Sequence, residues 1–384
     1  ITGVAPSAIR RAAEILGKSP RAVAIYGMGI TQHTVGTDNV KAVANLLMLT
    51  GNMGRKGTGF SPLRGQNNVQ GACDMGALPN VLPGYQKVIN GASRAKFSQA
   101  WKSDLDEKIG LTLTDMIQEA GAGKLRGMYV MGENPLMSDP DLNHVRQAFG
   151  RLELLVVQDI FPTETAMMAD VVLPAASFAE KDGTFTSTER RVQLLRKVLD
   201  PPGQARQDWE IVCHIAGRLG YDMPYRSSVE IMEEIASLAP IYGGISHLRL
   251  ARPGGLQWPC WDKKHLGTAR LHVKGFTRGK GKFHVVKFRP PAEAPSHEFP
   301  MVLTTGRVLE HFHTGSMSRR SRVLEAIEPE SHVDINPHDA AIMGLVEGDT
   351  VQVSSCRGRV FTKMRPDRRV PQGLAFMAFH WSEA

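Results

Sequence analysis

A dense run of polar residues and glycines occupies residues 64–76 of this chain. The run includes Arg64, Gln66 and Asp74 but few apolar side chains, so burial of apolar surface does not explain its composition. Polar groups at this density stay at the surface or need hydrogen-bond partners. The guanidinium of Arg64 could hold a small carboxylate through two parallel N–H···O bonds, or it could satisfy loop carbonyls or a phosphate. We therefore expect a loop that wraps a large polar ligand.

Carboxylates and histidines elsewhere offer further polar chemistry. Asp159 follows an apolar run, and its carboxylate could accept hydrogen bonds from a guanine base or could cap the next helix. Asp170 precedes another apolar run and is a second candidate for the same face of the sheet. Asp74 could accept from ligand amino groups or cap the segment after it. His311 and His313 form a His-x-His pair, but no third ligand follows at the spacing of a metal site.

The cysteines exclude several classes of site. The four cysteines are far apart and form no Cys-x-x-Cys pair, which is not the spacing of a zinc or iron–sulfur site. They do not form a disulfide framework either, so we expect a reducing, cytoplasmic location. The residues concerned are Cys73, Cys213, Cys260 and Cys356.

Charge and hydropathy set further limits. The net charge is +8, but the basic residues are scattered, and the densest cluster, residues 319–322, has no interleaved aromatic residues. Nucleic acid is therefore not the expected partner, whereas a polyanionic cofactor would also favour positive potential. No apolar run approaches the roughly 18 residues that a membrane helix needs.

The elements that must position these groups alternate between helices and strands. Helices are predicted over residues 6–16, 38–49, 141–149 and 208–219, a helical turn over 163–168, and strands over 22–26, 128–131, 152–157 and 171–173. The apolar strand 22–26 is expected to be buried, and Gly27 and Gly29 after it can turn backbone N–H groups toward a phosphate. Such alternation predicts an α/β fold with a parallel sheet.

The last part of the chain changes character. Residues 225–295 are mixed in composition and are interpreted as a long connection. Short β-rich pieces separated by turn residues follow, which predicts a small β-barrel domain. The expected strands span residues 301–305, 333–335, 350–354, 359–364 and 374–379.

Together these motifs resemble the molybdenum- or tungsten-dependent formate dehydrogenases, in the superfamily that binds two molybdopterin guanine dinucleotides. Residues 336–351 resemble its C-terminal dinucleotide-binding barrel. Besides residues 64–76, the matching motifs occur in order at residues 26–33, 50–54, 132–135, 157–159, 169–174, 188–193 and 305–307. The implied domains are the end of one α/β cofactor-binding domain (1–66), a second such domain (67–224), a connection (225–295) and a truncated barrel (296–384).

The resemblance also implies residue roles. Arg64 would orient formate beside the metal. No metal ligand is expected in this chain, because a selenocysteine or cysteine ligand and a 4Fe–4S cluster would lie upstream of residue 1 in relatives. The expected cofactor-binding residues are Met28, Gly29, Gln32, Gln66, Asp74, Gly132, Asn134, Asp159, Thr163, Asp170, Arg307 and His311.

The implied activity is the reversible oxidation of formate to carbon dioxide. Electrons would leave through an iron–sulfur cluster in the N-terminal half of the same subunit, toward iron–sulfur or flavin electron-transfer subunits. One alternative is a nitrate reductase, whose loop usually lacks the form of residues 64–68. Another is a cofactor-free structural subunit of a respiratory complex, which would have little use for dense polar loops. Molybdenum and tungsten remain open, and so does the electron acceptor.

Overall fold

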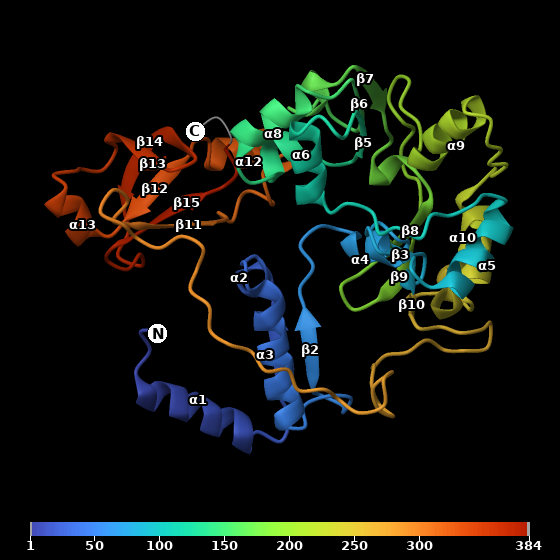
Figure 1. The fold of residues 1–384 in the computed structure, drawn as a ribbon, viewed down its shortest axis with the longest axis horizontal. Coiled ribbons are helices and arrows are strands. Elements are labelled where there is room, and N and C mark those ends of the chain that lie inside the picture. The colour runs from blue at the N-terminus through green and yellow to red at the C-terminus, as the bar shows by residue number, and fades with distance from the viewer. Residues whose placement is uncertain (1, 382–384) are drawn as a thin grey trace. The chain divides into compact units, whose positions relative to one another are not determined.

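The computed structural model describes residues 2–381 (Figure 1). These residues divide into two compact units. Unit 1 comprises the residues up to Gly110 together with Asp182–Arg196 and Pro224–Ala292. Unit 2 comprises Leu111–Lys181, Lys197–Met223 and the residues from Glu293 onward. Each unit is therefore assembled from three separate stretches of the chain.

Unit 1 begins with the strand–glycine–helix arrangement that the sequence predicts. Its elements are α1 (Pro6–Lys18), β1 (Val23–Tyr26), α2 (Met28–Thr31), α3 (Gly36–Leu49) and β2 (Gly59–Pro62). The strands β1 and β2 pair in parallel, and Figure 1 shows α3 running beside β2. The expected burial of β1 is wrong, because Val23 is 48% exposed and Ile25 64%. Alternate side chains of a strand point to opposite faces, and one face of this two-stranded sheet is left open by the described residues.

The rest of unit 1 has its own core. Its elements are α4 (Val69–Asp74), β3 (Val81–Leu82), β4 (Gln86–Lys87), α5 (Gly91–Trp101), β8 (Gly183–Thr186), β9 (Arg191–Leu195), α10 (Ser228–Leu238), η3 (Pro240–Tyr242), α11 (His247–Leu250) and β10 (Leu256–Gln257). Strands β10, β9 and β8 form an antiparallel sheet. The buried residues are Val192, Met232, Ala239, Tyr242, Ile245, Leu250 and Cys260.

Residues 225–295 thus contain more structure than the expected connection. They form α10 and α11 and supply most of the buried residues of that core. Met232, Ile235 and Leu238 recur at helical spacing along α10, which is the pattern of a helix with one buried face. The glycine- and charge-rich stretches further along, at 252–255 and 279–282, conceal this pattern in the composition of the segment.

The first part of unit 2 confirms the predicted parallel α/β arrangement. Strands β5 (Gly127–Met131), β6 (Leu154–Asp159) and β7 (Val171–Pro174) form a parallel sheet in that order. Val145 and Phe149 of α8 pack with Val157 of β6 in its core. The accompanying helices are α6 (Leu113–Gly121), α7 (Pro135–Ser138), α8 (Leu142–Phe149), η1 (Ala166–Met168), η2 (Phe178–Glu180) and α9 (Asp208–Arg218).

The predicted C-terminal strands are also confirmed. They are β11 (Val302–Gly306), β12 (His332–Ile335), β13 (Thr350–Ser355), β14 (Gly358–Pro366) and β15 (Leu374–Ala378), with η4 (Ser318–Arg320), α12 (Arg322–Ile327) and α13 (Pro337–Ile342) between them. The strands form one mixed sheet in the order β11-β15-β12-β14-β13, packed around Val333, Met364 and Met377. Across residues 2–381, no helix has the length and apolar character needed to cross a bilayer.

Candidate functional site

The polar run 64–76 divides into an exposed head, residues 64–67, and a tail, residues 70–74, in which Gln70, Gly71 and Asp74 are buried. The tail is the helix α4, which follows Asn68 in the left-handed conformation with φ 60°. The Asn68 Oδ1 atom accepts from the Thr186 backbone N–H at 2.9 Å and fixes the start of α4 to β8. A β-carbon on Gly71 would lie 2.2 Å from that Oδ1 atom, so glycine is required there.

Arg64 lies at the head of the run and keeps part of its guanidinium available. Its backbone N–H donates to Thr188 Oγ1 at 2.9 Å, and its Nε donates to Gln70 Oε1 at 3.3 Å. The side chain is otherwise exposed, and no partner of its two terminal nitrogens is found among the described residues. A planar anion could therefore bind these two nitrogens, and the expected role of Arg64 stays a prediction.

Asp74 lies in the tail and is fully buried. Its Oδ1 accepts from Gln70 Nε2 at 2.8 Å and from the Tyr85 hydroxyl at 2.8 Å, and its Oδ2 accepts from the Tyr242 hydroxyl at 2.6 Å. Burial, together with the Asp74 charge, raises the pKa of both tyrosines, so both phenols stay protonated and donate. Asp74 ends α4 and is enclosed by protein donors, so neither the ligand-facing nor the capping role fits this geometry.

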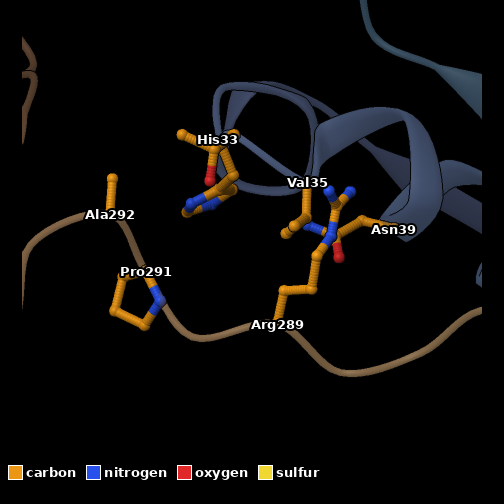
Figure 2. A pocket seen from close by; sticks show the side chains of 7 residues that line it. His33, Val35, Asn39, Arg289, Pro291 and Ala292 are labelled. Atoms are coloured by element: carbon orange, nitrogen blue, oxygen red, sulfur yellow. The ribbon is translucent and has the colours of Figure 1, made fainter.

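The residues expected around α2 are placed at an exposed turn. Gln32 follows α2, and its carboxamide, like that of Gln66, is exposed without a partner among the described residues. Met28 begins α2 and is half-buried, and the Gly29 carbonyl accepts from the His33 ring at 2.9 Å. A cavity of about 320 Å³ opens beside this turn (Figure 2). It is lined by His33, Thr34, Val35, Asn39, Arg289, Pro291 and Ala292.

Two of the residues expected in unit 2 are occupied by internal hydrogen bonds. Asn134 is buried, and its Nδ2 donates to Glu164 Oε2 at 2.7 Å and to Ser316 Oγ at 3.0 Å. Its Oδ1 accepts from the Thr165 hydroxyl at 2.7 Å. The hydroxyl of the buried Thr163 accepts from the backbone N–H of Ala166, the first residue of η1, at 3.2 Å. These side chains hold the loops after β5 and β6 together and have little capacity left for a ligand.

Gly132 lies at the carboxyl end of β5 and has the left-handed φ of 64°. An added β-carbon would meet nothing within 4 Å there, so the backbone conformation, and not close packing, favours glycine.

The two candidate aspartates lie at opposite ends of the β5–β6–β7 sheet. Asp159 ends β6 and pairs in register with Pro174, whereas Asp170 precedes β7 and accepts through Oδ2 from the Leu155 N–H at 2.7 Å. Asp170 is therefore not on the same face as Asp159, contrary to expectation. Parallel strands have their carboxyl ends at one edge, and ligands of such sheets bind there, which favours Asp159 alone.

Asp159 does not cap a helix, contrary to one of its two expected roles, because the next helical turn, η1, begins only at Ala166. Its Oδ1 accepts from the Ile160 and Phe161 backbone N–H groups at 2.6 and 3.3 Å, so it holds the turn that follows β6. No partner of its Oδ2 is found among the described residues. Burial raises the pKa of this carboxyl, while the two backbone N–H groups oppose the shift. The free Oδ2 could still accept from a guanine base.

Arg307 and His311 lie in a group of aromatic and basic side chains after β11. Arg307 is 3.2 Å from the His313 Nδ1 atom, and its guanidinium lies 5.2 Å from the ring of Phe379. His311 is buried; its Nε2 lies 2.8 Å from the Glu328 carbonyl, and its Nδ1 has no partner among the described residues. Arg307 remains exposed and His311 is enclosed, so only Arg307 can reach a ligand directly in this geometry.

Sequence reasoning missed His380, which belongs to the same group. This fully buried ring accepts from the Val308 N–H at 3.1 Å and donates to the His313 carbonyl. Burial lowers its pKa to about 4. Gln70, Tyr85 and Tyr242 were also missed. Only Gln70 had a signal, because it lies one helical turn before Asp74 within the polar run.

Comparison with known proteins places this chain in a family. The chain matches the molybdopterin oxidoreductase model over residues 11–218 and the molybdopterin dinucleotide binding domain over residues 301–384. It is 50% identical over its whole length to the F420-dependent formate dehydrogenase subunit alpha of Methanocaldococcus jannaschii, covering 57% of that protein. It is 39% identical, over 99% of its length, to formate dehydrogenase H of Escherichia coli, covering 54% of it.

A solved structure supports the fold. Acetylene hydratase from Pelobacter acetylenicus superposes with a TM-score of 0.70 at 17% sequence identity, over 98% of this chain and 56% of that one. The chain spans little more than half the length of the curated relatives it matches. The order of its motifs, its α/β architecture and these matches lead to one conclusion: the chain belongs to the molybdopterin oxidoreductase family.

Proposed function

We propose that the complete protein to which this chain belongs catalyses the reversible two-electron oxidation of formate to carbon dioxide. One observation carries the proposal: Arg64, at the exposed head of a glycine-rich polar loop, keeps two terminal guanidinium nitrogens available for a carboxylate. The curated relatives named formate dehydrogenases share 39–50% identity across nearly the whole chain, which supports the same activity.

The cofactor of this proposal is a molybdenum or tungsten centre held by two molybdopterin guanine dinucleotides. The available donor and acceptor groups suit such a ligand: the Gln32 and Gln66 carboxamides can bond pterin or phosphate groups, and Asp159 Oδ2 can accept from guanine. Arg307 can add positive charge for a phosphate. Asp74 in unit 1, and Asn134 and Thr163 in unit 2, would support the ligand-facing groups of their own unit, because their polar atoms are already paired within the protein.

In the proposed mechanism the cofactor supplies the two-electron redox chemistry, and this chain supplies binding and orientation. The Arg64 guanidinium forms two parallel N–H···O bonds to the formate carboxylate and fixes the direction of its C–H bond. This restriction converts a random encounter into a fixed reacting geometry. The same positive charge raises the local concentration of an anionic substrate.

The metal ligand and the 4Fe–4S cluster are proposed to lie outside this chain. Among the described residues, no three histidine, cysteine, aspartate or glutamate side chains gather as a metal site. Iron–sulfur or flavin subunits would receive the electrons, and the unpaired cysteines of the chain suit a reducing, cytoplasmic location.

The test uses the complete protein, purified without oxygen. We expect molybdenum or tungsten near one atom per chain, release of guanine nucleotide on denaturation, and formate-dependent reduction of a dye. Nitrate is offered to the reduced protein in parallel. Metal-loaded protein that is inert toward formate would overturn the proposal, and so would preferential nitrate reduction.

A further inference from the structure

We propose that Gln70 is a positioning residue for Arg64: its carboxamide occupies the Nε–H of the guanidinium, so that an anion is bound end-on by the two terminal nitrogens. This inference rests on the proposed function, since it assigns the supporting structure of the same anion-binding arginine. The observation is the continuous chain of hydrogen bonds that joins Arg64 to the buried Asp74 through Gln70.

The orientation of the Gln70 amide follows from its neighbours. Its Nε2 lies 2.8 Å from Asp74 Oδ1 and 2.9 Å from the Tyr85 oxygen. Tyr85 donates its own hydroxyl proton to Asp74, so its oxygen can only accept from Gln70. A flipped amide would place its carbonyl oxygen against the Asp74 carboxylate. Both Gln70 N–H groups therefore point inward, and Oε1 must face Arg64.

The network that holds Gln70 is largely buried, although Tyr85 is 36% exposed. Asp74 is fully buried, Gln70 is 6% exposed, and Tyr242 is 2% exposed. Tyr242 approaches from η3 and donates to the second Asp74 oxygen, so the carboxylate is held from two sides within unit 1. Since every acceptor and donor in the network has a partner, rotation of Gln70 would leave buried polar groups unpaired.

This arrangement determines how the arginine can bind an anion. A guanidinium offers two bidentate edges: one formed by Nε and one terminal nitrogen, the other by both terminal nitrogens. Gln70 uses Nε, and the terminal edge is left for the carboxylate. The side chain is then held by the protein before the substrate arrives, which reduces the entropy lost on binding.

The test compares Gln70→Met and Gln70→Glu with the parent in the complete, cofactor-loaded protein. Gln118→Met is the matched control, because Gln118 is an exposed glutamine on α6. We expect Gln70→Met to retain metal and guanine content while kcat/KM for formate falls about tenfold, with changes in both kcat and KM. The control should match the parent.

A second readout does not depend on turnover. Phenylglyoxal modifies accessible arginines, and the extent of reaction at Arg64 can be read by mass spectrometry of its peptide. In the parent, formate should protect Arg64; in Gln70→Met, protection should require a concentration of formate about tenfold higher. Loss of the protein fold would instead expose many arginines at once. Arg94 and Arg249 donate to backbone carbonyls in the folded protein, so increased phenylglyoxal modification of these two residues would indicate unfolding.

The Gln70→Glu variant adds a pH signature. The new carboxyl would face Asp74, Tyr85 and Arg64, with Tyr242 and Arg190 beside Asp74. When this carboxyl is ionised, it repels Asp74 and neutralises the charge of Arg64. When it is protonated, it can donate a hydrogen bond to Asp74, as the amide does, and still accept from Arg64. Activity relative to the parent should therefore recover as the pH falls, and Gln70→Met should show no such recovery.

The outcomes separate this inference from the proposed function. Loss of activity and of formate protection in Arg64→Lys, with parental behaviour in Gln70→Met, would overturn the positioning role alone. Inertness of the metal-loaded parent toward formate would overturn the proposed function first. Loss of metal or guanine content in Gln70→Met in proportion to activity would also overturn the positioning role, because the residue would then support the cofactor.

Discussion

The head and the tail of the polar run 64–76 have similar compositions and opposite environments. In the head, Arg64 and Gln66 are exposed and keep polar atoms without partners among the described residues. In the tail, Gln70 and Asp74 are buried and their polar atoms bond protein groups. The comparison teaches that a polar residue in a ligand-binding loop can contact the ligand or support the residue that does, and that pairing distinguishes the two.

The same distinction applies to the aspartates of the β5–β6–β7 sheet. Asp159 lies at the carboxyl edge with one oxygen free, and Asp170 lies at the amino edge, bonded to Leu155. Substitution of a group with free polar atoms should change ligand binding with little effect on folding. Substitution of a group whose polar atoms are already paired within the protein should lower the stability of the fold and have little direct effect on ligand binding.

The largest effect is expected for Asp74→Leu in the tail. It leaves the Tyr85 and Tyr242 hydroxyls and the Gln70 amide without their acceptor. Each buried unpaired donor costs about 1–3 kcal/mol, so the free energy of unfolding should fall by about 3–5 kcal/mol. Urea unfolding of the complete protein measures this, with the exposed Asp222→Leu as control. An unchanged urea midpoint would mean that the hydrogen bonds of Asp74 in the tail do not stabilise the folded protein.

A pH-dependent effect is expected for His380, a paired group in unit 2. Burial lowers its pKa to about 4 from the ordinary 6.5, so protonation favours the unfolded state. The stability from the neutral ring is complete above pH 6.5 and is lost as the pH falls toward 4, up to about 3 kcal/mol.

His380→Gln should therefore be less stable than the parent at neutral pH, and the difference should shrink on acidification. Urea midpoints between pH 7 and pH 4 measure the slope. The exposed His338→Gln is the control. Parallel pH curves for His380→Gln and the parent would show that this ring is not buried in its neutral form.

At the head of the loop, Arg64→Lys should leave folding and metal content intact and lower kcat/KM for formate by about 100-fold. Lysine keeps the charge but loses the planar, two-pronged grip, so kcat should fall as well as KM rise. The control is Arg11→Lys on the exposed face of α1. Cofactor content and activity are measured on one preparation. If both fall in proportion, Arg64 binds a phosphate of the cofactor and not formate.

The smallest effect is expected for Asp159→Ala. Loss of a charge-assisted hydrogen bond should weaken retention of one guanine dinucleotide by about 1.5 kcal/mol. Guanine nucleotide released on denaturation measures occupancy. Asp170→Ala, at the other end of the sheet, should keep full guanine content. Equal guanine content in both variants would leave Asp159 only its bonds to the Ile160 and Phe161 backbone in the loop after β6.

The sequence by itself determined the class of the molecule and much of its local structure. Apolar runs bounded by turn residues correctly predicted β5, β7 and the C-terminal strands, because strand periodicity and turn chemistry are local properties. The polar run and the arginine at its head were likewise visible, since composition alone shows that burial cannot explain such a segment.

Only the tertiary structure decided which polar groups are free. The sequence offers both Arg64 and Asp74 as ligand-binding residues, yet Asp74 is enclosed because Tyr242, 168 residues away, reaches its second oxygen. Likewise, β1 is exposed because the described residues give it a single neighbouring strand. Helix α10 contributes to a core because its apolar face packs in the same buried cluster as Val192 of β9. Pairing and burial depend on contacts between segments distant in sequence, and local composition does not encode them.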